Sequence, residues 1–287
     1  MITISKNDYI TTDGSNDSFT VNIKSFPKTH NNYFIESLRA AEEIYSNKQG
    51  KLHILYSGGV DSEYALSVFL SLGMDVTPVI VKMAPSYNEH DLKYAFDFCY
   101  EKKLKPVVID IDFEEFVNSG KILDIAKSMK SCVYHYSTTA HAISKLDGTV
   151  ICGDGEPYIK RNDDGTWSVT FYEYDYSLVN YFTNNGIYGT PRFSTYRPEM
   201  IPSFLKNPRM RELAENKHQG KLGSNSSKVL IYNSVSNFKL KIRPKYHGFE
   251  LIENLDIFKN EIFKEFDSLP WTGVYSEDYY QFLNRYM

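Results

Sequence analysis

The sequence has no long apolar run and few cysteines, and each absence excludes a class of protein. No stretch approaches the roughly 20 apolar residues that cross a bilayer. The first residues, which include Lys6 and Asp8, lack the apolar segment of a signal peptide. The three cysteines, at positions 99, 132 and 152, have neither the even number of a disulfide framework nor the spacing of a metal clip. We therefore expect a cytoplasmic protein with buried free thiols and no membrane partner.

Strong charge of either sign is also lacking, and so are two common phosphate-binding motifs. A net charge of -4 over 287 residues gives no general attraction to nucleic acid or anionic lipid. The pattern G-x-x-x-x-G-K-[ST] does not occur, and Gly153-Asp154-Gly155 lacks the third glycine of a dinucleotide fingerprint. The 42% hydrophobic content suffices for a sizeable core in one large domain, or in one domain with a smaller appendage.

What the sequence does contain is a short apolar run, Leu52–Leu55, that leads into the segment YSGGVDS at 56–62. The glycine pair lets backbone N–H groups come close to an anion, and the helical pattern that follows adds the partial positive charge of a helix N-terminus. Ser57 and Ser62 can donate hydrogen bonds to phosphate oxygens. Asp61 would repel a phosphate unless a divalent cation lay between them, so this acid implies magnesium.

The spelling SGGVDS matches the SGGxDS signature of the PP-loop ATP pyrophosphatases, and the chain resembles that family at this loop. Family members cleave ATP to AMP and pyrophosphate while they adenylate a substrate. The resemblance implies that ATP and Mg²⁺ are the cofactors. The residues that it assigns to the nucleotide are Ser57, Gly58, Gly59, Val60, Asp61 and Ser62.

Strand and helix patterns alternate from residue 52 to residue 152, which is typical of a parallel sheet with helices on both faces. Further strands are predicted at 76–81, 106–111 and 149–152. We expect an α/β fold with a doubly wound parallel sheet of about five strands, of the HUP-like type that the PP-loop resemblance implies. The expected parts are an N-terminal extension (1–50), an ATP-binding domain (51–161) and a mostly helical C-terminal substrate or lid region (162–287) packed on the same core.

A second glycine-rich, acidic loop, Gly153-Asp154-Gly155-Glu156, follows the last predicted strand of this alternation. It resembles the G-x-G-x-D-E loop of the synthetase domain of asparagine synthetase and beta-lactam synthetase, which faces pyrophosphate and magnesium. Glu156-Pro157 replaces the Asp-Glu pair of that family, so the carboxylate role falls to Asp154 or Glu156. The resemblance implies nucleotide contacts from Gly153, Asp154 and Gly155, and metal ligation by Asp61 with Asp154 and Glu156. A plain surface turn after the strand is the alternative.

Three cations are candidates for contact with the nucleotide. Lys160 and Arg161 follow the second loop directly and could neutralise charge on leaving pyrophosphate, so we assign them a catalytic role. Lys82 follows the second predicted strand, near the place where this fold class holds adenine and ribose. Its alternative is that of a lysine in water at the end of a strand.

The sequence beyond residue 160 offers three further segments. Residues 158–160 and 167–171 predict a β-hairpin around Asn162-Asp163-Asp164-Gly165. The segment 217–228 reads as a lid over phosphates or as a plain loop. Strict alternation at 238–245 predicts an extended segment with Lys239, Lys241, Arg243 and Lys245 on one face. Such a row could hold pyrophosphate, an acidic substrate or an RNA backbone, or simply protect a solvated edge strand.

These observations together predict an AMP-forming ligase. A substrate oxygen, expected to be a carboxylate, attacks the α-phosphate, and ammonia or an amine then displaces AMP. The layout resembles asparagine synthetase without its glutaminase domain. Two alternatives remain: a PP-loop enzyme that modifies tRNA or a nucleobase, and a nucleotide-binding protein without turnover. The acceptor, the nitrogen donor and the oligomeric state are left open.

Overall fold

The fold was analysed in a computed structural model. The structure describes residues 10–12, 19–21, 31–153, 157–171, 177–219, 228–269 and 275–286. Among these residues, no helix is long and apolar enough to cross a membrane. The cysteines at 99, 132 and 152 are free thiols, as expected; Cys99 and Cys152 are buried, whereas Cys132 is only partly buried.

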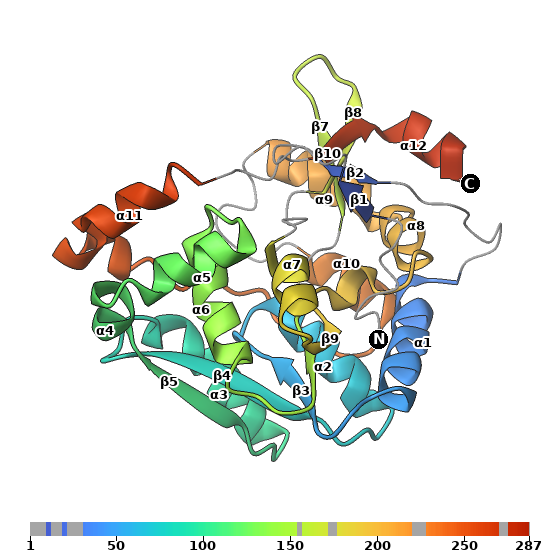
Figure 1. The fold of residues 1–287 in the computed structure, drawn as a ribbon. Helices are drawn as coiled ribbons and strands as arrows, with labels where there is room; N and C mark the ends of the chain where they lie inside the picture. Colours follow the sequence, from blue (N-terminus) through green and yellow to red (C-terminus); the bar gives the residue numbers. More distant parts are fainter. Residues whose placement is uncertain are drawn as a thin grey trace.

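A five-stranded parallel sheet forms the centre of the molecule (Figure 1). Its strands, in spatial order, are β5 (Val107–Asp112), β4 (Thr77–Ala84), β3 (Leu52–Leu55), β6 (Thr149–Ile151) and β9 (Tyr188–Thr190). Neighbouring strands are parallel throughout. The predicted α/β fold with a parallel sheet of five strands is confirmed. The fifth strand comes from the region 162–287, so that region completes the sheet.

The order of the strands reverses at β3. The chain runs outward from β3 to β4 and β5, then returns to the other side of β3 to add β6 and β9. Ile54 of β3 is aligned with Ile151 of β6, so these two strands end at nearly the same level. In open α/β sheets, ligands bind beyond the carboxyl ends of the strands at the point where the order reverses. The loops that follow β3 and β6 occupy that point.

Helices cover both faces of the sheet, which makes it doubly wound (Figure 1). The helices that precede or connect its strands are α1 (Tyr33–Ser46), α2 (Val60–Ser71), α3 (Glu89–Glu101), α4 (Phe113–Asn118), α5 (Lys121–Met129), α6 (Tyr134–Ile143) and α7 (Ser177–Asn184). Val150 of β6 packs in one apolar cluster with Ala140 of α6 and Phe182 of α7. Its neighbour Ile151 belongs to a different cluster, with Ile44 of α1 and Val68 of α2. Successive strand residues thus point to opposite, covered faces, as a buried parallel strand requires.

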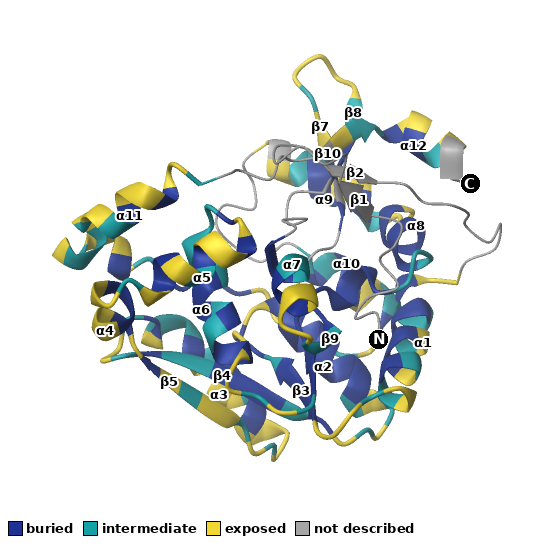
Figure 2. Cartoon of the chain, viewed as in Figure 1, coloured by how far each residue is buried: buried dark blue, intermediate teal, exposed yellow. Residues whose placement is uncertain are grey.

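A second, antiparallel sheet stands apart from the first, at the top of Figure 1. Its order is β10 (Tyr275–Asp278), β8 (Trp167–Phe171) and β7 (Tyr158–Arg161). The β7–β8 pair is the hairpin predicted from the sequence, with Arg161 opposite Trp167. The hairpin tip is exposed. The strands of the parallel sheet are largely buried, with the exception of the edge strand β5 (Figure 2). A separate pair, β1 (Ile10–Thr12) and β2 (Phe19–Val21), falls within the predicted N-terminal extension.

The C-terminal region is mostly helical, as predicted, but its helices are short. They are η1 (Phe193–Thr195), α8 (Met200–Leu205), α9 (Arg209–His218), α10 (Val229–Val235), η2 (Ile252–Asn254), η3 (Asp256–Lys259), α11 (Glu261–Phe266) and α12 (Tyr279–Tyr286). Residues 220–227 of the predicted lid segment lie outside the described residues.

The extended cationic face predicted at 238–245 is wrong. Lys239 has a left-handed φ of 57°, so side chains on either side of it do not alternate as they would along a strand. No strand of the described residues includes this segment. Lys239, Lys241 and Lys245 are exposed, but Arg243 is buried.

Candidate functional site

The loop Ser57–Gly59 joins β3 to α2 at the switch point of the sheet. Gly58 has a φ of +85°, and a Cβ there would lie 2.9 Å from the carbonyl oxygen of Asp91 in α3. A side chain at this position would therefore be strained and would also collide with the neighbouring backbone. Two features therefore require glycine at position 58: the left-handed backbone conformation and the close packing against α3.

Hydroxyl groups brace the loop from within. The Gly59 N–H donates to Ser57 Oγ at 3.2 Å, and Ser62 Oγ donates to the Gly59 carbonyl at 3.0 Å. The N-cap of α2 is Gly59, so no side chain caps the first turn of this twelve-residue helix. An uncapped helix N-terminus beside a glycine loop presents backbone N–H groups and partial positive charge to an anion.

The loop after β6 lies directly against the first loop. A Cβ on Gly153 would lie 2.7 Å from Ser62 Cα and 2.9 Å from Ser62 N, so only a glycine permits this approach. The structure thus brings Gly153 together with the Ser57–Ser62 loop, as the sequence predicted. Asp154, Gly155 and Glu156 lie outside the described residues, and their nucleotide and metal roles stay predictions.

Asp61, the predicted magnesium ligand, has two partners from α10 and the residue before it. Tyr232 donates its hydroxyl to Asp61 Oδ1 at 2.7 Å, and the Lys228 ammonium donates to Oδ2 at 3.2 Å. The carboxylate keeps 25% of its side-chain surface exposed. Tyr232 was missed in the sequence because it is 171 residues away, and Lys228 was seen only as one cation of a polar segment. No local pattern pairs them with Asp61.

A second acid of α2 forms a buried ion pair. Glu63 accepts a hydrogen bond from Tyr56 at 2.7 Å and pairs with Arg243 at 2.5 Å. The Arg243 guanidinium also lies 5.2 Å from the centre of the Tyr94 ring, within range of a cation–π contact. Arg243 therefore fixes the C-terminal segment to the helix behind the loop. It is not part of an exposed cationic row.

The three cations that the sequence assigns to the nucleotide, Lys82, Lys160 and Arg161, lie on strands away from the Ser57–Ser62 loop. Lys82 lies inside β4 because the strand continues to Ala84, and its ammonium is 3.6 Å from Asp110 on β5. Arg161 ends β7 and pairs with Glu215 of α9 at 3.3 Å, both side chains being partly exposed. Lys160, on the same strand, is exposed. No contact found among the described residues links these three cations to the Ser57–Ser62 loop.

On the other side of the loop, the first turn of α3 carries a buried acid. Asp91 Oδ1 is buried and accepts no hydrogen bond from the described residues. Burial raises the pKa of Asp91 to about 7, and the nearby Glu250 adds to that rise while His90 opposes it. Glu250 itself is held by His90 at 2.9 Å and by the backbone of His247 at 2.7 Å. One oxygen of Asp91 thus has no donor among the described residues, and the charge of His90 with backbone hydrogen bonds from Asp91 and Leu92 offsets only part of the effect of burial.

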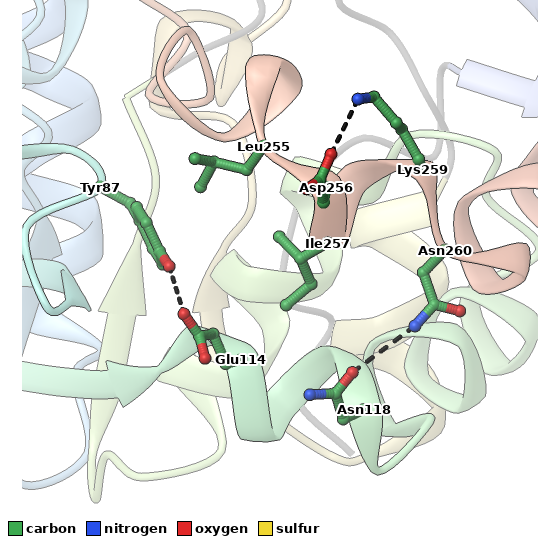
Figure 3. A pocket seen from close by; sticks show the side chains of 8 residues that line it. All are labelled: Tyr87, Glu114, Asn118, Leu255, Asp256, Ile257, Lys259 and Asn260. Carbon is green, nitrogen blue, oxygen red and sulfur yellow. Dashed lines mark hydrogen bonds and ion pairs between the residues drawn. The ribbon is translucent and has the colours of Figure 1, made fainter.

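A hollow of ≈ 500 Å³ lies at the β5 side of the molecule, and Figure 3 shows the side chains that line it. Its polar groups satisfy one another: Tyr87 donates to Glu114 at 2.5 Å, and Lys259 donates to Asp256 at 2.8 Å. Its lining includes no residue of the Ser57–Ser62 loop. We therefore place the candidate site at the switch point and not in this hollow.

The groups at the switch point suit a magnesium–nucleotide complex. Gly58 and Gly153 let the two loops pack closely against neighbouring backbone, and the Asp61 carboxylate already holds a cation, the Lys228 ammonium. Carboxylate oxygen is the donor that Mg²⁺ prefers, and Mg²⁺ is usually held by one or two carboxylates together with phosphates. Within the described part of the chain, no group of three potential ligands could hold a metal without such help.

Comparison with protein-family models finds no match, and comparison with curated proteins finds none either. Among solved structures, the chain is similar to a predicted subunit of tRNA methyltransferase from Methanocaldococcus jannaschii, with 19% sequence identity and a TM-score of 0.32. The alignment covers 58% of this chain and 74% of that one. A functional assignment therefore depends on the residues of the chain itself.

Proposed function

We propose that the protein binds ATP with magnesium at the switch point and uses it to adenylate a substrate oxygen with release of pyrophosphate. The observation that carries the proposal is the pair of loops at this point. An uncapped helix N-terminus and a cation-binding carboxylate lie against a glycine that tolerates no side chain. This arrangement agrees with the resemblance of SGGVDS to the PP-loop signature.

The residues of the loop have separate tasks in this proposal. Backbone N–H groups of the first turn of α2 receive phosphate oxygens, and the hydroxyls of Ser57 and Ser62 add donors beside them. Asp61 would hold magnesium, which supplies charge neutralisation on the leaving pyrophosphate. The protein contributes position and electrostatics, so the reaction needs no nucleophilic side chain.

The substrate oxygen is proposed to belong to a carboxylate, and ammonia or an amine then displaces AMP. The acyl–phosphate bond to AMP breaks as the carbon–nitrogen bond forms, and AMP leaves with the electron pair. Lys160 and Arg161 are proposed to stabilise pyrophosphate, for which Arg161 would have to leave its ion pair with Glu215.

Calorimetry with ATP and Mg²⁺ tests the binding step directly. We expect uptake that requires magnesium, and a loss of about tenfold or more in affinity for Asp61→Asn, because hydrogen bonds and ion pairs to a charged group are worth about 1.5–3 kcal/mol. Asp256→Asn is the matched control, since Asp256 is an exposed acid paired only with a neighbouring lysine. Equal ATP affinity in the wild type and in Asp61→Asn would contradict the proposal.

An RNA acceptor is the second candidate, because Lys239, Lys241 and Lys245 stay exposed although Arg243 does not. Pyrophosphate release in the presence of amino acids, ammonia or tRNA separates the candidates. tRNA binding that weakens steeply with salt, together with tRNA-dependent release, would favour RNA. ATP binding without release under any condition would favour a nucleotide-binding protein without turnover.

A further inference from the structure

The two oxygens of the Asp61 carboxylate have unlike partners. Oδ1 receives a hydrogen bond from a neutral group, the Tyr232 hydroxyl, at 2.7 Å. Oδ2 faces a cation, the Lys228 ammonium, at 3.2 Å. Both partners are contributed by the start of α10, one helical turn apart, so a single element sets both contacts.

The Tyr232 contact is rigid. Tyr232 is 1% exposed, and its ring stacks on Tyr64 at 4.2 Å with an interplanar angle of 13°. Tyr33 and Phe204 pack around the same pair.

The Lys228 contact is of another kind. Lysine is a point charge on a flexible four-carbon chain, whereas the phenol of a stacked tyrosine has almost no freedom. The Lys228 side chain keeps 17% of its surface exposed, and it meets the carboxylate oxygen that is not committed to the buried stack. A second cation that reaches Oδ2 must therefore compete with this ammonium.

We propose that Tyr232 is a positioning residue that holds Oδ1 of Asp61 and reserves Oδ2 for one cation, which is Lys228 in the free protein and a divalent metal when nucleotide is bound. This inference rests on the proposed function for the identity of the metal. It has two consequences. Asp61 binds the metal through a single oxygen, and the metal alone binds weakly because it must first displace Lys228.

Manganese is the probe, and the signal of the free ion in electron paramagnetic resonance is the readout, so no turnover is needed. Without nucleotide, Lys228→Met removes the competing cation, and we expect the affinity for Mn²⁺ to rise about tenfold. With a non-hydrolysable ATP analogue present, Tyr232→Phe frees Oδ1 and lets the carboxylate rotate, and we expect Mn²⁺ affinity to fall about tenfold.

Tyr64→Phe is the matched control, because it removes a hydroxyl from the same stack. That hydroxyl donates to Ser37 and not to Asp61, so Mn²⁺ affinity should stay at the wild-type value. Equal loss in Tyr64→Phe and Tyr232→Phe would show a structural effect of the stack and would overturn the inference. The inference would also be overturned if Lys228→Met left the affinity for Mn²⁺ unchanged, or made it too weak to detect. If neither the wild type nor any variant binds the nucleotide analogue, the proposed function fails. If the analogue binds but the affinity for Mn²⁺ does not change on substitution of Tyr232 or Lys228, only this inference fails.

Discussion

Two acids near the Ser57–Gly59 loop, the buried Glu63 and the partly buried Asp91, differ in how their charge is paired. Glu63, behind the loop on α2, is paired with Arg243 and also accepts a hydrogen bond from Tyr56. Asp91, in front of it on α3, has a buried oxygen with no hydrogen-bond partner among the described residues and a second acid, Glu250, nearby. A buried charge is costly unless it is paired. Glu63 is thus a fixed structural charge, whereas Asp91 is a group whose charge depends on pH.

The largest effect on stability is expected when the buried ion pair between Glu63 and Arg243 is broken. Arg243→Met would leave the buried Glu63 carboxylate without its partner, and we expect a loss of about 3–5 kcal/mol in the free energy of unfolding. Urea denaturation measures it. Lys127→Met, which removes a half-exposed partner of Glu265, is the control and should cost under about 1 kcal/mol. Similar losses in both variants would show that burial does not set the difference.

The second prediction concerns Asp91, whose raised pKa should make the free energy of unfolding depend on pH. Burial raises the pKa of Asp91 from an ordinary value of 3.8 to about 7 in the folded protein, so the native state favours the protonated acid. That stabilisation is fully present below pH 4 and is lost as the pH rises through 7. Integrated over this range, the raised pKa corresponds to roughly 4 kcal/mol.

Asp91→Asn removes the titration and keeps the shape of the side chain. We expect the variant to be more stable than the wild type at pH 8, with the difference shrinking toward pH 4, in thermal unfolding measured across that range. A constant difference at every pH would contradict the assignment of this titration to Asp91. Glu114→Gln, on an exposed acid of α4, gives the background pH dependence.

The smallest effect on the free energy of unfolding is expected for a substitution of Arg161. Its pair with Glu215 is partly exposed, so solvent screens it, and Arg161→Gln should change the free energy of unfolding by under about 1 kcal/mol. If pyrophosphate release nevertheless falls tenfold or more, Arg161 acts on the nucleotide as the sequence predicted. Unchanged release would limit its role to the contact between β7 and α9.

The sequence predicted the sheet and the first loop because both are encoded locally. Apolar runs such as Leu52–Leu55 and the glycines that follow them need no knowledge of distant residues. The pairs that define the site are different: Tyr232 meets Asp61 across 171 residues and Arg243 meets Glu63 across 180. No periodicity reports such contacts.

Local patterns also misled where the backbone departed from a regular element. The alternation at 238–245 fits a strand, but the left-handed conformation of Lys239 breaks it and Arg243 turns inward. The apolar run at 76–81 predicts a strand that ends at Lys82, yet β4 continues to Ala84, and Lys82 lies opposite Asp110 of β5 in the register.

The contact between Gly153 and Ser62 fixes the spacing of the two loops by main chain alone. A contact between main-chain atoms cannot be relieved by choosing another rotamer, so a displacement of one loop must move the other with it. The ends of β3 and β6 are therefore coupled mechanically, and the two loops respond to a bound molecule as one unit.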